Sequence, residues 1–180
     1  QISYDYTLAN TSADHRRWLR ELPAGFALDW NGVRVRMAHG SPRRINEFLW
    51  ASMTPAPFIG RLLDEHGTDL LLVTHTGLHW SRFLDETGTR GVVNVGAIGR
   101  PANDGDTAVW YALLELQPSP IQRSSRPHGS SPDRIRTELR RVTYDHDRLA
   151  AEMRTESLPE EFVETILDGW WTTCLEILPA

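Results

Sequence analysis

The sequence predicts an α/β fold from two observations. At three places an apolar run of strand length ends in a histidine, a glycine or another small residue, and segments with helical spacing lie around these runs. The three places are 37–40 (MAHG), 73–77 (VTHTG) and 94–99 (NVGAIG). In α/β folds the side chains that bind ligands converge at the carboxyl ends of strands. We therefore expect the three strand ends to form one shared site.

The first half of the chain is expected to form a helix, a β-hairpin, two further helices and a strand. Residues 11–22 show helical spacing after a Thr-Ser pair that can cap a helix, and they end before a proline. Residues 26–38 alternate on both sides of Asn-Gly, which favours a type I′ turn, so they predict a hairpin. Helices are expected over 44–52 and 57–66, and an apolar run predicts a strand over 70–73.

The second half of the chain is expected to hold the remaining strands before the last helices. Strands are predicted over 92–95, 110–116 and 136–144, and helices over 147–155, 159–168 and 170–177. Pro, Ser and Arg dominate 117–132, which predicts an exposed, flexible connection. Because 180 residues suffice for one ordinary core, we expect a single domain over 1–180.

Composition excludes several classes of protein. No apolar run approaches the ~18 residues that a membrane-spanning helix needs, so we expect no membrane association. The net charge of −5 argues against a stable nucleic-acid complex. All 19 basic residues are arginine, which excludes Schiff-base and P-loop lysine chemistry. Cys174 is the only cysteine, so no intramolecular disulfide can form, and we expect a cytoplasmic protein.

Two strand-end histidines, His39 and His75, are candidate metal ligands. Neutral imidazole is the commonest protein ligand for divalent transition metals, and neighbouring strand ends can bring two of them together. A single histidine at a strand end is nevertheless more often a hydrogen-bonded structural residue. Spacing alone leaves both interpretations open.

Three segments resemble the carboxyl-terminal half of the calcineurin-like metallophosphoesterases, specifically their small bacterial and archaeal phosphodiesterase-like branch. They are VRVRMAHGSPRRINEFLW, LLLVTHTGLHWSRFLDETGTRGVVNVGAIGRPANDGDTAVWYALLEL and VTYDHDRLAAEMRTESLPEEF, and the similarity runs from about Ala13 to Gly169. In that family an HGSP-like strand end supplies one metal ligand, a Gly-His-Thr-His motif supplies two, and an Asn-Pro-Gly-Ser-hydrophobic-Gly loop follows. The resemblance implies a β-sandwich flanked by helices, of which this chain would hold the carboxyl-terminal half of the α/β/β/α fold.

The resemblance implies metal-binding roles for three histidines. His39 and His75 match the two histidines that bind the same metal of the family's binuclear pair. Gly77 stands where the family has its second Gly-His-Thr-His histidine, a ligand of the other metal. His79, two positions further on, is the candidate replacement, and on an extended strand residues 77 and 79 face the same way.

Further residues are assigned roles around the implied site. Asn94, Gly96 and Gly99 match the family's structural loop, with mild departures from its Pro and Ser between them. Arg44 and Arg100 lie near the strand ends and are candidates to bind a phosphate by bidentate hydrogen bonds. The competing interpretation is that both are ordinary surface arginines.

The largest departure from the family concerns its amino-terminal half. That half carries an Asp-x-His, a Gly-Asp whose carboxylate bridges the metals, and a Gly-Asn-His with the proton-donating histidine, and none of these stands in the 180 residues as a match. Two expectations follow. The chain is either the second half of a longer polypeptide or a degenerate relative.

The expected function is that of a metal-dependent phosphoesterase. The resemblance implies hydrolysis of a phosphodiester or phosphomonoester by a metal-bound hydroxide at a binuclear site of Mn²⁺, Fe or Zn²⁺. The substrate classes left open are a phosphorylated small molecule, a nucleotide and a phosphoprotein. The alternative is a non-catalytic protein-binding module of the same fold, as in the retromer subunit of this superfamily. Trp170 and Trp171 cover either the core or a subunit contact, so a homo-oligomer is left open.

Overall fold

The computed structural model describes residues 2–97, 99–117 and 134–171, and these divide into two compact units. The first unit takes the described parts of 1–23, 99–109 and 142–180. The second takes those of 24–98 and 110–141. Each unit is described by itself below.

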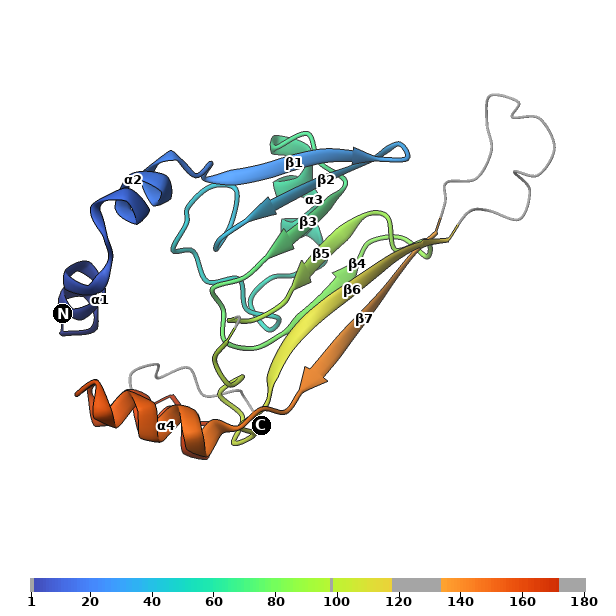
Figure 1. Cartoon of the computed structure of the whole chain (residues 1–180). Coiled ribbons are helices and arrows are strands. Elements are labelled where there is room, and N and C mark those ends of the chain that lie inside the picture. Colours follow the sequence, from blue (N-terminus) through green and yellow to red (C-terminus); the bar gives the residue numbers. More distant parts are fainter. Residues whose placement is uncertain (1, 98, 118–133, 172–180) are drawn as a thin grey trace, which may run out of the picture. The chain divides into compact units, whose positions relative to one another are not determined.

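A five-stranded mixed sheet is the centre of the second unit (Figure 1). Its strands lie in the order β1-β2-β3-β5-β4. β2, β3 and β5 are parallel, whereas β1 and β4 pair antiparallel at the two edges. Their bounds are β1 Gly25–Trp30, β2 Val33–Ala38, β3 Leu70–Val73, β4 Trp80–Phe83 and β5 Gly91–Asn94. Because three neighbouring strands run in one direction, their carboxyl ends meet at one edge of the sheet.

The predicted hairpin over 26–38 is confirmed as β1 and β2. All six residues of each strand are paired, from Gly25 with Ala38 to Trp30 with Val33. Asn31 and Gly32 both have positive φ, at 52° and 86°, as a type I′ turn requires. The turn leads into β2, which ends at Ala38, and His39 is the next residue.

Each face of the five-stranded sheet is covered by a different layer. The helix α3 (Ala56–Glu65) packs on one face, and a separate two-stranded sheet, β6 (Val109–Gln117) with β7 (Arg134–Val142), packs on the other. On the α3 side the fully buried residues include Ile59, Leu62, Leu63, Leu71 and Val92. On the β6–β7 side the buried residues are Val33, Val35, Leu70, Val93 and Ile135. The second unit is therefore a helix on a sheet on a sheet, which agrees with the predicted α/β sandwich.

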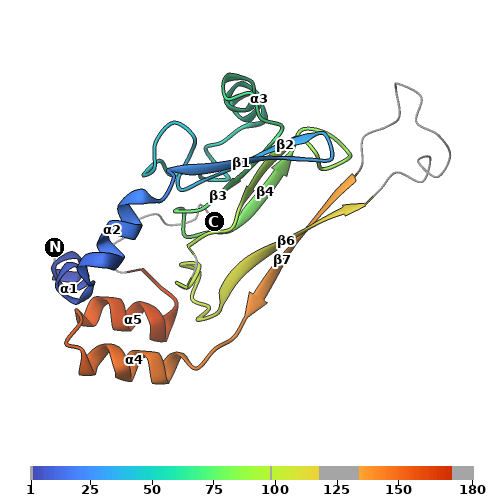
Figure 2. The same ribbon diagram turned by 45° about the horizontal axis from the view of Figure 1, so that its top comes forward.

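The first unit is built from helices. They are α1 (Ile2–Asn10), α2 (Ala13–Glu21), α4 (His146–Thr155) and α5 (Glu160–Asp168). Ser12 caps α2 by accepting a hydrogen bond from the His15 N–H, as its position in the sequence predicts. α4 and α5 lie side by side (Figure 2), and the Tyr6 hydroxyl of α1 donates to Glu156 at 2.8 Å.

Four elements differ from the sequence-based expectations. Residues 44–52 form turns and irregular backbone instead of a helix. The strand β4 and the helix α1 were not predicted, and of the expected helix over 170–177 the two described residues are not helical. The connection expected over 117–132 lies outside the described residues apart from Gln117, as does Cys174. In the part of the chain that the structure describes, no helix combines the length and apolarity needed to cross a membrane.

Candidate functional site

The site starts from the aligned ends of the three parallel strands. Their registers place Ala38, Val73 and Asn94 side by side as the last residues of β2, β3 and β5. His39 follows β2 directly, and His75 comes two residues after β3. The backbone of His75 has φ +77°, a left-handed conformation that costs a residue other than glycine about 1–3 kcal/mol. Such strain persists where the surrounding contacts fix the backbone.

The imidazoles of His39 and His75 lie against each other. His39 Nε2 and His75 Nδ1 are 3.1 Å apart, and the ring centroids are 4.8 Å apart at 63°. Two nitrogens bound at about 2.0–2.1 Å to one ion stand ~3.0–3.4 Å from each other. The separation of the two nitrogens, which in this structure is that of a hydrogen bond between the rings, also fits two ligands of a single divalent ion.

The environment of His75 favours its neutral form. Burial, and next the neighbouring charge of His39, lower the pKa of His75 below its ordinary value. A metal ligand has to be a neutral imidazole, so this shift keeps His75 ready to coordinate. The second ring nitrogen of His75, Nε2, is buried without a hydrogen-bond partner among the described residues.

A second layer of hydrogen bonds holds the strand ends together. The Asn94 side chain is fully buried, and its oxygen accepts a bond from the Gly96 N–H at 2.9 Å. The Thr74 hydroxyl donates to the Gly96 carbonyl. Gly96 has φ +79°, and a Cβ at this position would stand 2.6 Å from the Gly77 carbonyl oxygen. Only glycine permits this close approach of the loop after β5 to the turn that holds His75.

The loop between β2 and α3 is fastened to the strand ends through Leu49. The Leu49 carbonyl accepts hydrogen bonds from the Trp80 indole at 2.9 Å and from the Asn94 amide at 3.2 Å. The Thr76 hydroxyl donates to the same carbonyl at 3.3 Å and accepts from the Leu49 N–H at 3.1 Å. These long-range bonds replace the i to i+4 bonds of the helix expected over 44–52.

Sequence reasoning missed two aromatic residues beside the histidines. Phe48 packs on His75 with 4.4 Å between ring centroids, and Trp50 is stacked on Phe48 at 5.3 Å with an interplanar angle of 1°. A helix over 44–52 would point residues 48 and 50 in different directions, and that expectation hid the pair. The signal that could have found it is the apolar run of Phe48, Leu49 and Trp50, which begins eight residues after Gly40.

Comparison with solved structures identifies the fold. No family model matches the chain, and no curated protein matches it. A metallophosphoesterase from Sphaerobacter thermophilus is 26% identical over 91% of this chain, with a TM-score of 0.64. The fold is that of the calcineurin-like metallophosphoesterase superfamily. A hypothetical protein of Pyrococcus horikoshii OT3, PH1004, shares the fold at 19% identity over 87% of this chain, with a TM-score of 0.63.

This metallophosphoesterase-like chain spans only part of the similar proteins. It covers 66% of the Sphaerobacter protein and 54% of the Pyrococcus protein. Among the described residues no group of three or more His, Cys, Asp or Glu side chains could hold a metal ion. The two facing histidines are therefore an incomplete set of ligands by themselves.

The other residues predicted for the site have different surroundings. His79 is stacked on Trp110 of β6 with 3.9 Å between centroids. Arg44 is exposed in the loop after β2, where its backbone N–H donates to Ser41 and its carbonyl accepts from the Ser41 N–H. Arg100 belongs to the first unit and lies 3.8 Å above the Trp171 ring. Gly99, also of the first unit, has φ +76° with open space around it.

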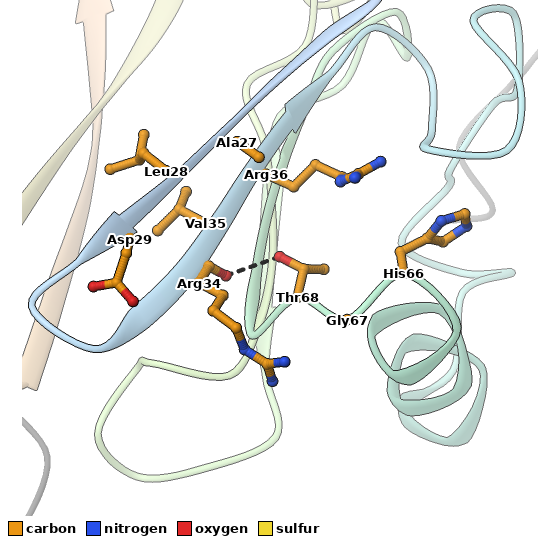
Figure 3. A pocket seen from close by; sticks show the side chains of 9 residues that line it. All are labelled: Ala27, Leu28, Asp29, Arg34, Val35, Arg36, His66, Gly67 and Thr68. Carbon is orange, nitrogen blue, oxygen red and sulfur yellow. Dashed lines mark hydrogen bonds between the residues drawn. The ribbon is translucent and has the colours of Figure 1, made fainter.

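A pocket of about 300 Å³ lies elsewhere on the same sheet, toward the amino ends of β2 and β3 (Figure 3). Arg34 and Arg36 of β2 line it, together with His66 after α3. The Arg34 side chain is already paired with Asp69, to which it donates at 2.9 and 2.6 Å. His39 and His75 follow the opposite ends of these strands, so this pocket is separate from the histidine pair.

Proposed function

We propose that this chain contributes to the metal centre of a phosphoesterase, with His39 and His75 as ligands of one divalent ion. The observation that supports this most strongly is the 3.1 Å separation of His39 Nε2 and His75 Nδ1 at the carboxyl edge of a metallophosphoesterase-type sheet. The lowered pKa of His75 adds support, because it favours the neutral imidazole, which has one nitrogen lone pair available for a metal ion.

The residues around the pair suit phosphoryl chemistry. A divalent ion bound there supplies positive charge that polarises a phosphoryl oxygen, and mixed histidine and carboxylate ligation is compatible with Mn²⁺, Fe or Zn²⁺. His39 and His75 hold the ion, and the hydrogen-bonded loop of Asn94 and Gly96 keeps their strand ends in register. Arg44 is a candidate to bind the substrate phosphate, because its guanidinium is exposed in the loop that follows His39.

The remaining ligands of the proposed centre come, on this proposal, from the part of the fold that the chain does not span. The chain covers only 54–66% of the two similar proteins, and two histidines do not complete a coordination shell. On this proposal His79 belongs to the second metal and replaces the family histidine at whose position this chain has Gly77. The His79 ring is stacked on Trp110, so it would have to bind the ion while it keeps this contact.

Metal affinity tests the proposal directly. We expect the polypeptide that contains this chain together with the remaining ligands to bind Mn²⁺ or Zn²⁺, and we expect His39→Ala and His75→Ala each to weaken binding by at least the 10- to 100-fold that loss of a supporting residue typically costs. Isothermal titration calorimetry measures the affinity for metal, and elemental analysis measures the metal content of the purified protein. Hydrolysis of a model phosphodiester and a model phosphomonoester by the same preparations then reports activity.

The matched control is His15→Ala, because His15 is an exposed histidine on α2. This variant should bind metal as the unmodified protein does. His79→Ala should remove a second equivalent of metal if His79 belongs to the centre. A protein that binds no stoichiometric metal and hydrolyses neither model ester would overturn the proposal.

A non-catalytic protein-binding module is the second candidate function. The observation that favours it is Gly77 at the position of a family metal ligand. On this alternative, metal would bind weakly and the His39→Ala variant would behave as the unmodified protein in every assay of hydrolysis. The two candidates are therefore separated by the same titrations.

A further inference from the structure

The loop after β2 presents two aromatic rings beside the histidine pair. Phe48 packs on the ring of His75 and on that of Trp50, with centroid separations of 4.4 and 5.3 Å. Phe48 nevertheless keeps 44% of its surface exposed. Burying apolar surface stabilises a protein or a complex by about 25 cal/mol per Å². A ligand ring that covers the exposed part of Phe48 is therefore favoured.

The backbone between the two rings is fixed. Leu49 is 2% exposed, and its N–H and carbonyl are both bound to side chains of the strand ends. Leu49 is buried in the core of the second unit, whereas Phe48 before it is exposed and Trp50 after it is half-buried. The rings are thus held in place before any ligand arrives, which lowers the entropy lost on binding.

We propose that Phe48 and Trp50 form a stacking platform for a nucleobase, which makes nucleotides the substrate class of this site. The platform consists of these two side chains and the adjoining face of His75. A nucleotide carries a planar base one ribose away from its phosphate, so a base on the platform leaves the phosphate near the two histidines. Stacking on aromatic rings accepts any base, because every base has a π face. The assignment to a substrate rests on the proposed phosphoesterase function.

Binding of adenosine, in the absence of metal, tests the platform on its own. Adenosine has a base and a ribose but no phosphate, so its binding does not depend on the metal centre. We expect saturable binding of adenosine and much weaker binding of ribose. Ligand-observed NMR measures both. Trp50→Ala and Phe48→Ala should each weaken adenosine binding by about 5- to 150-fold, the range typical of one lost stacking partner.

Two further variants and a control keep the test decisive. Trp50→Leu and Phe48→Leu retain apolar bulk while removing the aromatic face, and they should also weaken binding with the folded state intact by circular dichroism. Trp18→Ala removes a tryptophan that is 59% exposed on α2 and should leave adenosine binding unchanged.

The outcomes separate this inference from the proposed function. Adenosine binding should be the same with and without added Mn²⁺, because adenosine has no phosphate. A protein that binds adenosine through Trp50 but binds no metal contradicts the phosphoesterase function alone. Equal binding of ribose and adenosine, or unchanged adenosine binding in folded Trp50→Leu and Phe48→Leu, would overturn the platform.

Discussion

A strained backbone supports one of the two facing imidazoles. His75 has φ +77°, and its neighbours Thr74 and Thr76 are bonded to the Gly96 carbonyl and to Leu49. Neither bond involves the imidazole, so the ring stays available at the edge of the sheet. Sequence spacing predicted that His39 and His75 lie at neighbouring strand ends. It contained no sign of the left-handed backbone, which depends on bonds to residues 20 or more positions away.

At the amino ends of β2 and β3, a single carboxylate links the two strands. Asp69 accepts hydrogen bonds from the Arg34 backbone N–H, Nε and Nη2 at 2.9, 2.9 and 2.6 Å. These bonds, chiefly that from the Arg34 side chain, hold the pKa of Asp69 below its ordinary value of 3.8. A lowered pKa means that the folded state binds the proton less readily than the unfolded chain does. The stabilisation is therefore complete above pH 3.8 and is lost as the pH falls through the folded pKa.

Replacement of Asp69 should lower the free energy of unfolding in a pH-dependent way. Asp69→Asn removes the charge-assisted bonds and should cost roughly 1–2 kcal/mol near neutral pH, as measured by urea denaturation. The difference from the unmodified protein should shrink below pH 3.8. Asp64→Asn is the control, because the Asp64 side chain in its pair with Arg90 is 71% exposed, and it should cost less than about 0.5 kcal/mol. Equal costs for the two variants would contradict the assignment.

The hairpin has local signals and was predicted, whereas the loop over 44–52 and the strand β4 are fixed by distant partners and were not. The hairpin over 26–38 follows from Asn31-Gly32 and strand alternation, both readable within the segment. The segment 44–52 has helical spacing, but Leu49 is held by Thr76, which is 27 residues away. The strand β4 was missed for a similar reason, since it exists only by pairing with β5. Phe48 and Trp50 were not predicted as part of the site, because the expected helix over 44–52 would point them in different directions.

The loop after β5 offers a test of how closely the elements of the site approach each other. Gly96→Ala places a Cβ 2.6 Å from the Gly77 carbonyl oxygen at φ +79°, whereas Gly32→Ala meets open space at φ +86°. Both variants carry the left-handed penalty of about 1–2 kcal/mol. Gly96→Ala should lose roughly 1–3 kcal/mol more in urea denaturation, because the contact forces the loops apart. If the two variants lose the same free energy, the close approach is not what requires glycine at position 96.

At the scale of the whole molecule, buried side chains are distributed unevenly. The second unit contains two clusters of buried apolar residues, one on each face of the five-stranded sheet. In the first unit α5 buries Val163, Thr165 and Ile166, whereas α2 buries none of its residues. Isolated helices shorter than about 12–15 residues are marginal in water, so a helix of nine residues depends on what it packs against.

The protection of backbone amides from hydrogen exchange should therefore follow the burial of each element and not whether the element is a helix. Peptides that contain β3 and β5, where Leu71 and Val92 are 0% exposed, should exchange most slowly and report the global free energy of unfolding. Peptides from α2 should exchange faster than those from α5, because local opening of an unpacked helix costs about 0 kcal/mol. α5 is the internal control: it has nine residues, as α2 has, and belongs to the same unit, but it should be clearly protected. Equal protection of α2 and α5 by mass spectrometry would mean that α2 packs against something in solution, and the exposed Trp18 and Leu19 would then be the first residues to examine.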